Sequence, residues 1–406
     1  MTASQVDKRI QTYRTASVRL TVKDPAGKLI ANAPITVRQT RHKFLFGSAP
    51  FLLDRIEQKP LESVYKNLFA QLFNYATLPF YLESYEPVEG RPQKERLTNM
   101  ATWCQVNHIR TKGHPLVWFI NLPRWLFDKT PEGIEQAQFS RIKREVGGFS
   151  GLIDTWDVVN EPIAMSTYDP INPATQLCQK YGRVRLLKLA FDQARRANPV
   201  ATLLINDYET SKAYLKLLKD CIEAHVPFNA IGIQSHMHEG AWGAARVWEV
   251  CERFSRFGKP VHFTELSILS GKPKSEKDRK REVSGWKGTP EGEKNQAQQA
   301  REIYRVLFSH PSVEAITWWE FSDLGAWLGA PAGLLRANMT PKPAYTALLD
   351  LIKKEWWTGP LKLKTDNTGQ VHFQAFLGDY VIETSAGKAQ FSLDKLGDTE
   401  LTVQLH

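Results

Sequence analysis

The sequence predicts an α/β chain built around a closed (β/α)8 barrel, the TIM-barrel fold, with a small accessory β module formed by its N- and C-terminal segments. Three observations support this fold class. Between residues 44 and 350, eight short β-prone runs alternate with longer segments of helical periodicity. On both sides of that region the sequence alternates apolar and polar residues, as half-buried strands do. The length of 406 residues allows one large domain with appendages.

The β-prone runs are short, and each is followed by a stretch that predicts a helix. In residues 181–197 and 244–258, for instance, apolar residues recur three and four positions apart. Strands that alternate with helices favour a parallel sheet, and eight such units favour a closed ring. The runs are "FLFGSA" from 44, "NYATLPFY" from 74, "IRTKGHPLVW" from 109, "TWDVVNE" from 155, "TLLINDYE" from 202, "AIGIQSH" from 230, "VHFTELSI" from 261 and "AITWWEFSD" from 315.

The terminal segments are expected to contain strands only. Residues 17–39 alternate apolar and polar side chains around a Pro-Ala-Gly turn, which predicts a β hairpin with one covered face. After Trp357 the helical units stop, and alternation returns with Asn-Thr-Gly and Ala-Gly-Lys turns. We therefore divide the chain into an N-terminal β hairpin segment (1–43), the barrel (44–354) and a C-terminal β segment (355–406).

Composition excludes several classes of function. The formal charge is +10, yet no stripe of lysine and arginine alternates with aromatic residues, so we expect no nucleic-acid partner. The sequence contains no stretch of about 18 apolar residues, which is the length needed to span a bilayer. The four cysteines form no C-x-x-C pair, which argues against a zinc knuckle or a dense disulfide framework. The N-terminus lacks an apolar signal core, so the chain is either intracellular or lacks a signal that was removed.

Two glutamates stand at strand ends. Glu161 ends the fourth β-prone run, and Glu265 lies toward the end of the seventh. The active site of such a barrel is built from the C-terminal ends of its strands, and its fourth and seventh strands lie on roughly opposite sides of the ring. Two facing carboxyl groups are the minimal machinery for cleaving a glycosidic bond. A single strand-end glutamate could equally cap a helix or pair with an arginine.

Five motifs, in order along the chain, carry a family resemblance. "GHPLVW", "WDVVNEP", "GIQSHMH", "FTELSI" and "WWEFSDLGAW" resemble the motifs of family-10 glycoside hydrolases, the endo-β-1,4-xylanase family, over residues 44–350. The resemblance implies a retaining glycoside hydrolase that degrades a plant-type polysaccharide or oligosaccharide. It also implies that Glu161 is the acid/base and Glu265 the nucleophile.

The same resemblance assigns roles to the neighbours of the two acids. Asn160 matches the asparagine that hydrogen-bonds the sugar 2-hydroxyl beside the scissile bond. His236 matches the histidine that bonds the nucleophile and holds it ionised. Gln234 lies two residues before His236, on the same face of the strand, and is expected to approach the acid/base carboxyl.

Further substrate-binding residues follow from the family match. His114 matches the histidine near the reacting sugar. Trp319 and Trp327 match two tryptophans that wall the cleft, whereas Trp318 is expected to pack in the core. Asp207, in "NDYE", matches a family segment and is expected to be structural.

A metal site is the competing interpretation of the histidines. His236 and His238 form an H-x-H pair that could bind zinc, with His114 or His262 as a third ligand. A glycosidase that works with two carboxyl groups needs no metal and no cofactor. We therefore predict neither.

The segment after the second β-prone run departs from the family pattern. The family carries T-x-E-N-x-x-K there, whereas this chain reads "TLPFYLE", with Pro79, Phe80 and Glu83 at the three polar positions. Phe119 also stands where the family commonly has histidine. Because unpaired polar groups are costly, losing them should change which glycan fits, so we expect a decorated or non-standard glycan. The alternative is a non-catalytic carbohydrate-binding barrel.

An insertion at about 270–294 follows the nucleophile run. Its basic stretch, residues 272–281, predicts a solvated loop, since two acids interrupt it. The alternative hypothesis is that the insertion overhangs the leaving-group side of the cleft and offers Trp286 and lysines to an acidic substrate. We further expect a monomer, and a secreted or periplasmic location because a polymer is degraded outside the cytoplasm.

Overall fold

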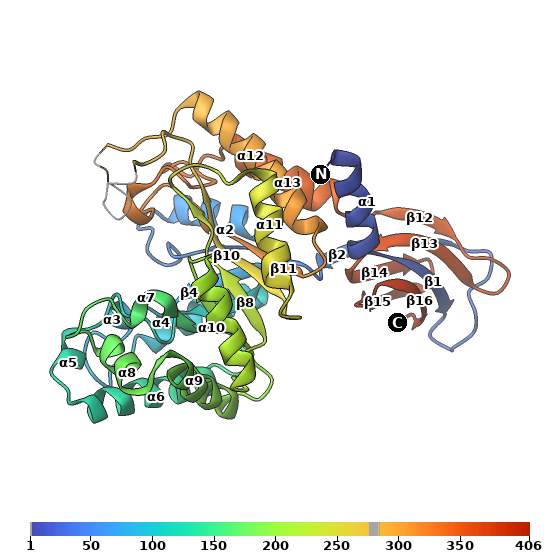
Figure 1. The fold of residues 1–406 in the computed structure, drawn as a ribbon. Helices are drawn as coiled ribbons and strands as arrows, with labels where there is room; N and C mark the ends of the chain where they lie inside the picture. Colours follow the sequence, from blue (N-terminus) through green and yellow to red (C-terminus); the bar gives the residue numbers. More distant parts are fainter. Residues whose placement is uncertain (1, 276–282, 284) are drawn as a thin grey trace.

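The chain folds into a barrel and a β sandwich that projects from one side of it (Figure 1). This computed structural model describes residues 2–275, 283 and 285–406. Eight parallel strands form the barrel, and β11 pairs with both β3 and β10, which closes the ring. The predicted (β/α)8 fold is therefore confirmed. The barrel strands are β3 (Leu45–Ala49), β4 (Tyr75–Pro79), β5 (Arg110–His114), β6 (Thr155–Asn160), β7 (Thr202–Asp207), β8 (Ala230–Ile233), β10 (Val261–Ile268) and β11 (Val313–Glu320).

Helices surround the barrel and bury one apolar stripe each against it. In α9 the buried residues recur at three and four positions, as the sequence predicted, but the helix begins after Gly182, whose φ of +74° ends the preceding helix. The helices of the barrel are α2 (Lys59–Leu72), α3 (Leu82–Tyr85), α4 (Lys94–Val106), α5 (Arg124–Phe127), α6 (Pro131–Gly148), α7 (Pro162–Met165), α8 (Pro173–Tyr181), α9 (Arg183–Ala197), α10 (Lys212–Glu223), α11 (Gly243–Ser255), α12 (Pro290–Ser309), α13 (Pro343–Asp350), the 3-10 turn η2 (Trp327–Gly329) and the π-helical turn η3 (Leu351–Glu355).

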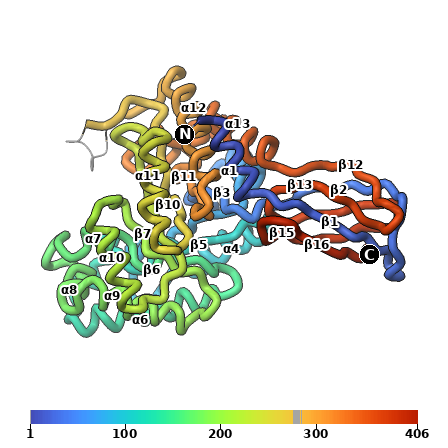
Figure 2. Tube along the Cα trace, turned by 45° about the vertical axis from the view of Figure 1, so that its right-hand side comes forward, coloured from blue at the N-terminus to red at the C-terminus, as the bar shows by residue number. Residues whose placement is uncertain are grey.

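The accessory module combines strands from both ends of the chain, which lie side by side in Figure 2. One sheet has the order β13-β1-β16 and the other β12-β2-β14-β15, and the apolar faces of both contribute to a core distinct from that of the barrel. The strands are β1 (Thr15–Lys23), β2 (Pro34–His42), β12 (Leu361–Lys364), β13 (Gln370–Phe376), β14 (Gly378–Thr384), β15 (Gly387–Leu393) and β16 (Gly397–Gln404).

The predicted N-terminal hairpin is wrong. β1 and β2 belong to different sheets, and each pairs with strands of the C-terminal segment instead of with the other. Alternation specifies that a strand has one buried face, but it does not specify the partner of that strand. The C-terminal strands supply the partners, so neither terminal segment forms its sheets alone.

An N-terminal helix, α1 (Ala3–Arg14), was not predicted. It carries only two buried apolar residues, Val6 and Ile10, which is too few for a clear helical pattern. It begins with a capping box between Thr2 and Gln5. At its end the guanidinium of Arg14 donates to the carbonyl oxygens of residues 308, 310 and 313, which fixes α1 against the barrel beside β11.

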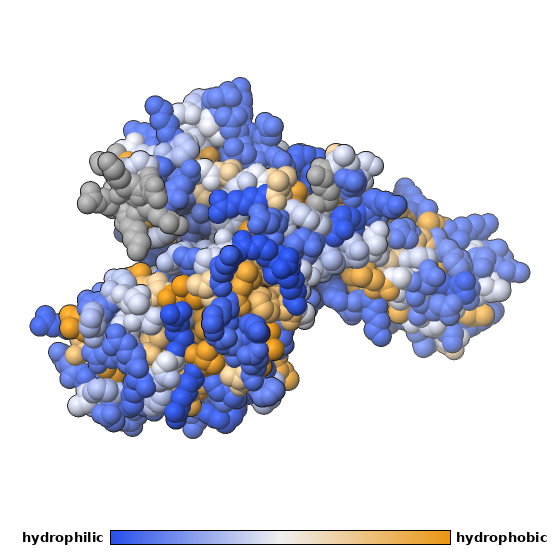
Figure 3. Space-filling view, viewed as in Figure 1, coloured by the Kyte–Doolittle hydropathy of each residue, from blue (hydrophilic) through white to orange (hydrophobic). Residues whose placement is uncertain are grey.

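The surface seen in Figure 3 is mainly hydrophilic, including most of the accessory module. Across the described ranges, no helix combines the length and the apolar character that a bilayer crossing requires. All four cysteines are buried and unpaired, as the absence of paired motifs predicted.

Candidate active site

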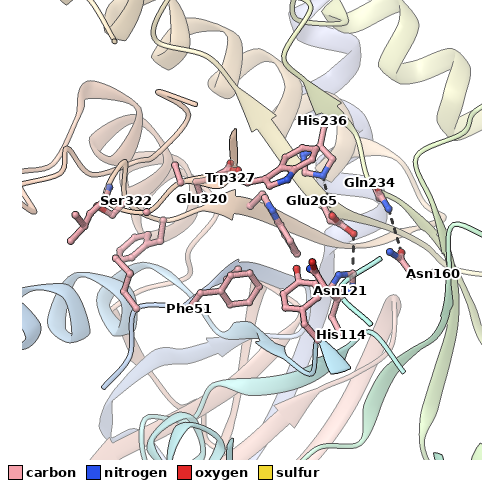
Figure 4. Close-up of a pocket in the computed structure, with 18 of the residues that line it drawn as sticks. Phe51, His114, Asn121, Asn160, Gln234, His236, Glu265, Glu320, Ser322 and Trp327 are labelled. Atoms are coloured by element: carbon pink, nitrogen blue, oxygen red, sulfur yellow. Dashed lines mark hydrogen bonds and ion pairs between the residues drawn. The ribbon is translucent and has the colours of Figure 1, made fainter. Parts of the chain in front are cut away.

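A cavity of about 280 Å³ opens at the C-terminal ends of the barrel strands. Figure 4 shows Glu265 between His236 and His114, with Gln234 and Asn160 joined by a hydrogen bond to one side of it. All eight residues predicted from the sequence line this one cavity: His114, Asn160, Glu161, Gln234, His236, Glu265, Trp319 and Trp327. They lie on the barrel strands, just after them, or, for Trp327, in the turn η2 that follows β11, so the fold brings together residues more than 200 positions apart.

Glu161 lies directly after β6 in a backbone conformation that side chains rarely adopt. Its φ of 55° and ψ of 48° are left-handed, and Pro162 begins helix α7 immediately afterwards. The amide of Gln234 donates to Oε1 of Glu161 over 3.0 Å. Burial raises the pKa of Glu161 above its ordinary value, the negative charge of Glu265 adds to the rise, and the bond from Gln234 opposes it. The carboxyl is therefore suited to hold a proton.

Glu265 has the opposite electrostatic environment. Burial by itself would raise its pKa, but the charge of His114 and the hydrogen bond from His236 outweigh that effect, so the pKa is lowered. His236 Nε2 lies 3.0 Å from Oε2, and His114 Nδ1 lies 4.0 Å from Oε1. The carboxyl is therefore suited to remain ionised beside a neighbour that is suited to be protonated.

Asn206, at the end of β7, connects the residues around both acids, and it was not predicted. Its amide nitrogen donates to Oδ1 of Asn160 over 2.8 Å and to Oε1 of Glu265 over 2.7 Å. Thr264 Oγ1 in turn donates to Oδ1 of Asn206 over 2.6 Å. Space for this side chain exists because residue 232 is glycine: a Cβ there would lie 2.3 Å from Oδ1 of Asn206. The sequence feature that could have identified Asn206 is its place as a polar residue toward the end of a β-prone run, one position before the end of β7.

Beneath the cavity, a buried charge network supports His114. Asp157 Oδ2 lies 2.7 Å from His114 Nδ1 and accepts a 2.6 Å bond from the ammonium of Lys112. Both Lys112 and Asp157 are fully buried. Burial would raise the pKa of Asp157, but the charge of Lys112 and the hydrogen bond from His114 lower it, so an ionised carboxylate orients the imidazole.

The three tryptophans differ as predicted in their burial. Trp318 is buried and donates its indole N–H to the carbonyl of Ala332, which is a packing role. Trp319 faces the cavity and contacts His114 and His236 edge-on, at 5.3 and 5.9 Å between ring centroids. Trp327 is 48% exposed and lines the cavity, with its ring 4.7 Å from that of His236.

Aromatic residues occupy the part of the cleft near the altered segment. Phe80 is buried among Tyr85, Phe149 and Trp156, so it belongs to the core and does not face the cavity. The next residue, Tyr81, lines the cavity together with Phe51, and their rings lie 6.0 Å apart. Neither was predicted, because neither belongs to a motif that carries chemistry.

The remaining positions of the altered segments lie outside the cavity. Glu83 is exposed on α3, and Phe119 is buried against Tyr168 at 4.5 Å. Phe80, Glu83 and Phe119, which depart from the family pattern, therefore offer no polar group to a ligand in the cavity. The cavity wall next to Phe80 is aromatic and is formed by Phe51 and Tyr81.

The described residues contain no group of three or more histidine, cysteine, aspartate or glutamate side chains placed to hold a metal ion. His238 packs on Trp327 at 5.4 Å, outside the cavity lining, and burial lowers its pKa to about 3. His262 lies below the cavity floor beside Lys112, and burial lowers its pKa to about 3 as well. Among the described residues, the histidines are therefore not placed together with further ligands of a zinc ion.

Most of the basic stretch predicted at 272–281 lies outside the described residues. Trp286 donates its indole N–H to the carbonyl of Lys272, over 2.9 Å, and its ring lies 5.7 Å from that of His238. Its ring also stacks under the ammonium of Lys274. Trp286 is not among the residues that line the cavity, so its contact with a substrate stays a prediction.

Two buried acids with oppositely shifted pKa values, at the mouth of a (β/α)8 barrel, define a barrel of the glycoside hydrolase class. The model of Glycosyl hydrolase family 10 matches residues 42–351, more than half of the chain. The chain therefore belongs to glycosyl hydrolase family 10.

Individual relatives are distant. The chain is 26% identical over 401 residues to the anti-sigma-I factor RsgI6 of Acetivibrio thermocellus, a match that covers 96% of this chain and 47% of that protein. It is 26% identical to endo-1,4-beta-xylanase C of Paenibacillus barcinonensis, covering 84% of this chain and 34% of that protein. It thus spans less than half the length of either relative. Among solved structures, xylanase 10B from Thermotoga petrophila in complex with xylobiose matches with a TM-score of 0.64 and 25% identity, over 77% of this chain and 95% of that one.

Proposed function

We propose that the chain is a retaining glycoside hydrolase that cleaves β-glycosidic bonds of a xylan-like polysaccharide or oligosaccharide. The observation that carries the proposal is the opposed electrostatics of the two acids. The pKa of Glu161 is raised and that of Glu265 is lowered, which is the pair of protonation states that such a reaction needs at its start.

The reaction runs in two steps. Glu161 donates its proton to the glycosidic oxygen while Glu265 attacks the anomeric carbon, so the bond to the leaving sugar breaks and a glycosyl–enzyme ester forms. Glu161, now ionised, then takes a proton from water as that water attacks the anomeric carbon, so the bond between this carbon and Glu265 breaks and the carboxylate is released. Asn160, held by Asn206 in the cavity, is placed to donate to a hydroxyl of the reacting sugar.

The lining of the cavity supports a neutral glycan. Of the lining residues that the structure describes, none is lysine or arginine, whereas Glu161, Glu265 and Glu320 are acids. The rings of Trp319 and Trp327 offer flat apolar faces, as sugar-binding clefts commonly do. The aromatic wall of Phe51 and Tyr81 favours a sugar that presents an apolar face or an apolar substituent there.

The decisive test is product analysis with a matched loss of the nucleophile. Wild type and Glu265→Ala are incubated with xylan, xylo-oligosaccharides and a panel of other plant and algal polysaccharides, and products are identified by mass. We expect wild type to release shorter sugar products and Glu265→Ala to release none. Added azide should restore cleavage of an aryl β-xyloside by Glu265→Ala and give the α-azide, because the small anion fills the place of the carboxylate and inverts the centre once. Equal product release by both proteins would contradict the assignment.

A carbohydrate-binding barrel without activity is the second candidate. It is favoured by the absence of polar side chains at Pro79 and Phe80, and by a 26% identical relative whose name is that of an anti-sigma factor. Calorimetric binding of oligosaccharides, without product release from any of the panel, would favour it over the hydrolase. We further propose a secreted or periplasmic location, because the degradation of a polymer requires contact with it outside the cytoplasm. We also propose that the protein acts as a monomer.

A further inference from the structure

A third carboxyl group lies in the cavity, and the two-acid reaction does not use it. Glu320 is the last residue of β11, is only 6% exposed and lines the same cavity as Glu161 and Glu265 (Figure 4). Its Oε1 is buried and has no hydrogen-bond partner within the described chain. An ionised carboxylate in such a place is costly, so this group requires a physical explanation.

Three short contacts connect Glu320 to the nucleophile. Oε2 of Glu320 lies 3.1 Å from the hydroxyl of Ser267, and that hydroxyl lies 2.9 Å from Nδ1 of His236. On its other side, Nε2 of His236 lies 3.0 Å from Oε2 of Glu265. The four side chains therefore form a continuous relay with a carboxyl group at each end.

Counting protons limits the states of this relay. Glu265 is ionised and accepts only, so His236 must carry its proton on Nε2. Ser267 has a single hydroxyl proton, which it can donate to His236, to Glu320 or to the backbone carbonyl of Glu265, 3.3 Å away, but to only one of them. The relay is continuous in two states. Either Glu320 is protonated and donates to Ser267, which donates to a neutral His236, or His236 is doubly protonated and Ser267 donates to an ionised Glu320.

Both states contain the same number of protons and keep an N–H on the nucleophile. We propose that Glu320 is a positioning residue that shares one proton with His236 through Ser267, and so holds the N–H of His236 on Glu265. The inference rests on the proposed role of Glu265. It extends that function by adding a residue that acts on the nucleophile without touching the substrate's reacting atoms.

The charges around the relay agree with a shared proton. Burial raises the pKa of Glu320 to about 7, His236 and the Ser267 hydroxyl oppose the rise, and Asp323 adds to it. The phenol of Tyr81 also faces Glu320 from the end of β4. Around His236 lie the carboxyl groups of Glu161 and Glu265 and the imidazole of His238.

Loss of the shared proton should break one contact of the relay. When both carboxyl groups are ionised and His236 is neutral, the Ser267 hydroxyl can donate its proton either to His236 or to Glu320. The acceptor that receives no proton then has its lone pair directed at the lone pairs of the Ser267 oxygen, which is repulsive. The hold on Glu265 weakens as a result. A change at Nδ1 of His236 that follows the protonation of Glu320, and disappears when Glu320 is replaced, is therefore the signature of the relay.

The test follows the ring nitrogens of His236 by NMR of the full chain labelled with ¹⁵N-histidine, with the signal assigned by His236→Ala. In wild type we expect a step in the Nδ1 shift with a midpoint near pH 7. Glu320→Gln should abolish the step, because an amide cannot hold the proton, and Ser267→Ala should abolish it by breaking the relay. Glu314→Gln is the matched control, since Glu314 is exposed on the same strand β11 and carries the same charge, and should keep the step.

No step in wild type between pH 5.5 and 8.5, or an unchanged midpoint in Glu320→Gln, would overturn the proposal. If Glu320→Gln does not fold, Ser267→Ala decides in its place. The NMR experiment needs no substrate, so it stands even if the proposed hydrolase activity fails.

A kinetic readout addresses the function of the relay. With 2,4-dinitrophenyl β-xylobioside the leaving group departs without a proton, so the rate of glycosylation does not require Glu161 as an acid. We expect the wild-type rate to fall by up to about tenfold per pH unit above the midpoint, as for the loss of a single proton. Glu320→Gln should show a flat profile there, with KM unchanged. A wild type that releases no dinitrophenolate contradicts the hydrolase on this glycoside, whereas an unaltered profile in Glu320→Gln contradicts the relay.

Discussion

The side-chain amide of Asn206 lies 2.7 Å from Oε1 of Glu265, and the same nitrogen lies 2.8 Å from Oδ1 of Asn160. One buried group thus holds both Glu265, the proposed nucleophile, and Asn160, the residue proposed to bind the sugar beside it. Because Asn206 is rigid on the end of a strand, it sets the distance between them.

Gly232→Ala should impair activity without removing any functional side chain. The added methyl group would lie 2.3 Å from Oδ1 of Asn206, on the neighbouring strand, so Asn206 must move and release Glu265 and Asn160. We expect kcat/KM to fall at least tenfold on the cognate glycoside. Gly147→Ala, in α6, is the matched control, because its added Cβ meets nothing closer than 3.6 Å. Equal activity of both variants would show that the position of Asn206 does not matter.

His236→Ala should move the acid limb of the pH–rate profile to higher pH. The hydrogen bond and charge of His236 help to lower the pKa of Glu265 against the effect of burial, so without them this pKa rises. The nucleophile is then protonated over a wider acidic range, and kcat/KM falls there first. His238→Ala removes the same ring two residues away, without contact to Glu265. An acid limb that shifts equally in both variants would contradict the role of His236.

The sequence predicted that Glu161 and Glu265 meet in one cavity better than it predicted the contacts around them. Glu161 and Glu265 stand at the ends of β-prone runs, and the topology of a closed parallel ring brings such ends together whatever the loops do. Asn206, Ser267 and Glu320 belong to the hydrogen-bond network around Glu265, yet each acts by a contact with a residue from another strand. Such contacts depend on register and on side-chain direction, neither of which a single strand encodes.

The accessory module shows the same limit at the level of the fold. Every strand in it is visible as alternation, but the partners of β1 lie 349 to 381 residues away. Similarly, Phe80 and Tyr81 are adjacent and both aromatic, and only the structure shows that one is buried in the core while the other faces the cavity.

Phe80→Ala and Tyr81→Ala should therefore fail in different ways. Phe80 is fully buried against three aromatic rings, and its truncation leaves a cavity, so we expect the free energy of unfolding to drop by about 3–5 kcal/mol. Tyr81→Ala should change the free energy of unfolding far less but alter the order in which glycosides are preferred. Urea denaturation and kcat/KM on a glycan panel measure the two effects. If Tyr81→Ala leaves the panel order unchanged, the aromatic wall does not select the substrate.

Glu320 should make the folded chain less stable as the pH rises. Its pKa is about 7 in the fold and 4.5 ordinarily, so the folded state binds the proton more tightly than the unfolded state does. The stabilisation is fully present below pH 4.5 and is lost as the pH rises through 7, and the difference amounts to roughly 3 kcal/mol. Glu320→Gln cannot titrate, so its free energy of unfolding, relative to wild type, should rise by about that amount between pH 4 and pH 8. Glu302→Gln, which removes an exposed charge from α12, should follow the wild-type curve when urea denaturation is measured across the same range. A parallel curve for Glu320→Gln would mean that the carboxyl group is ionised throughout and holds no proton in the fold.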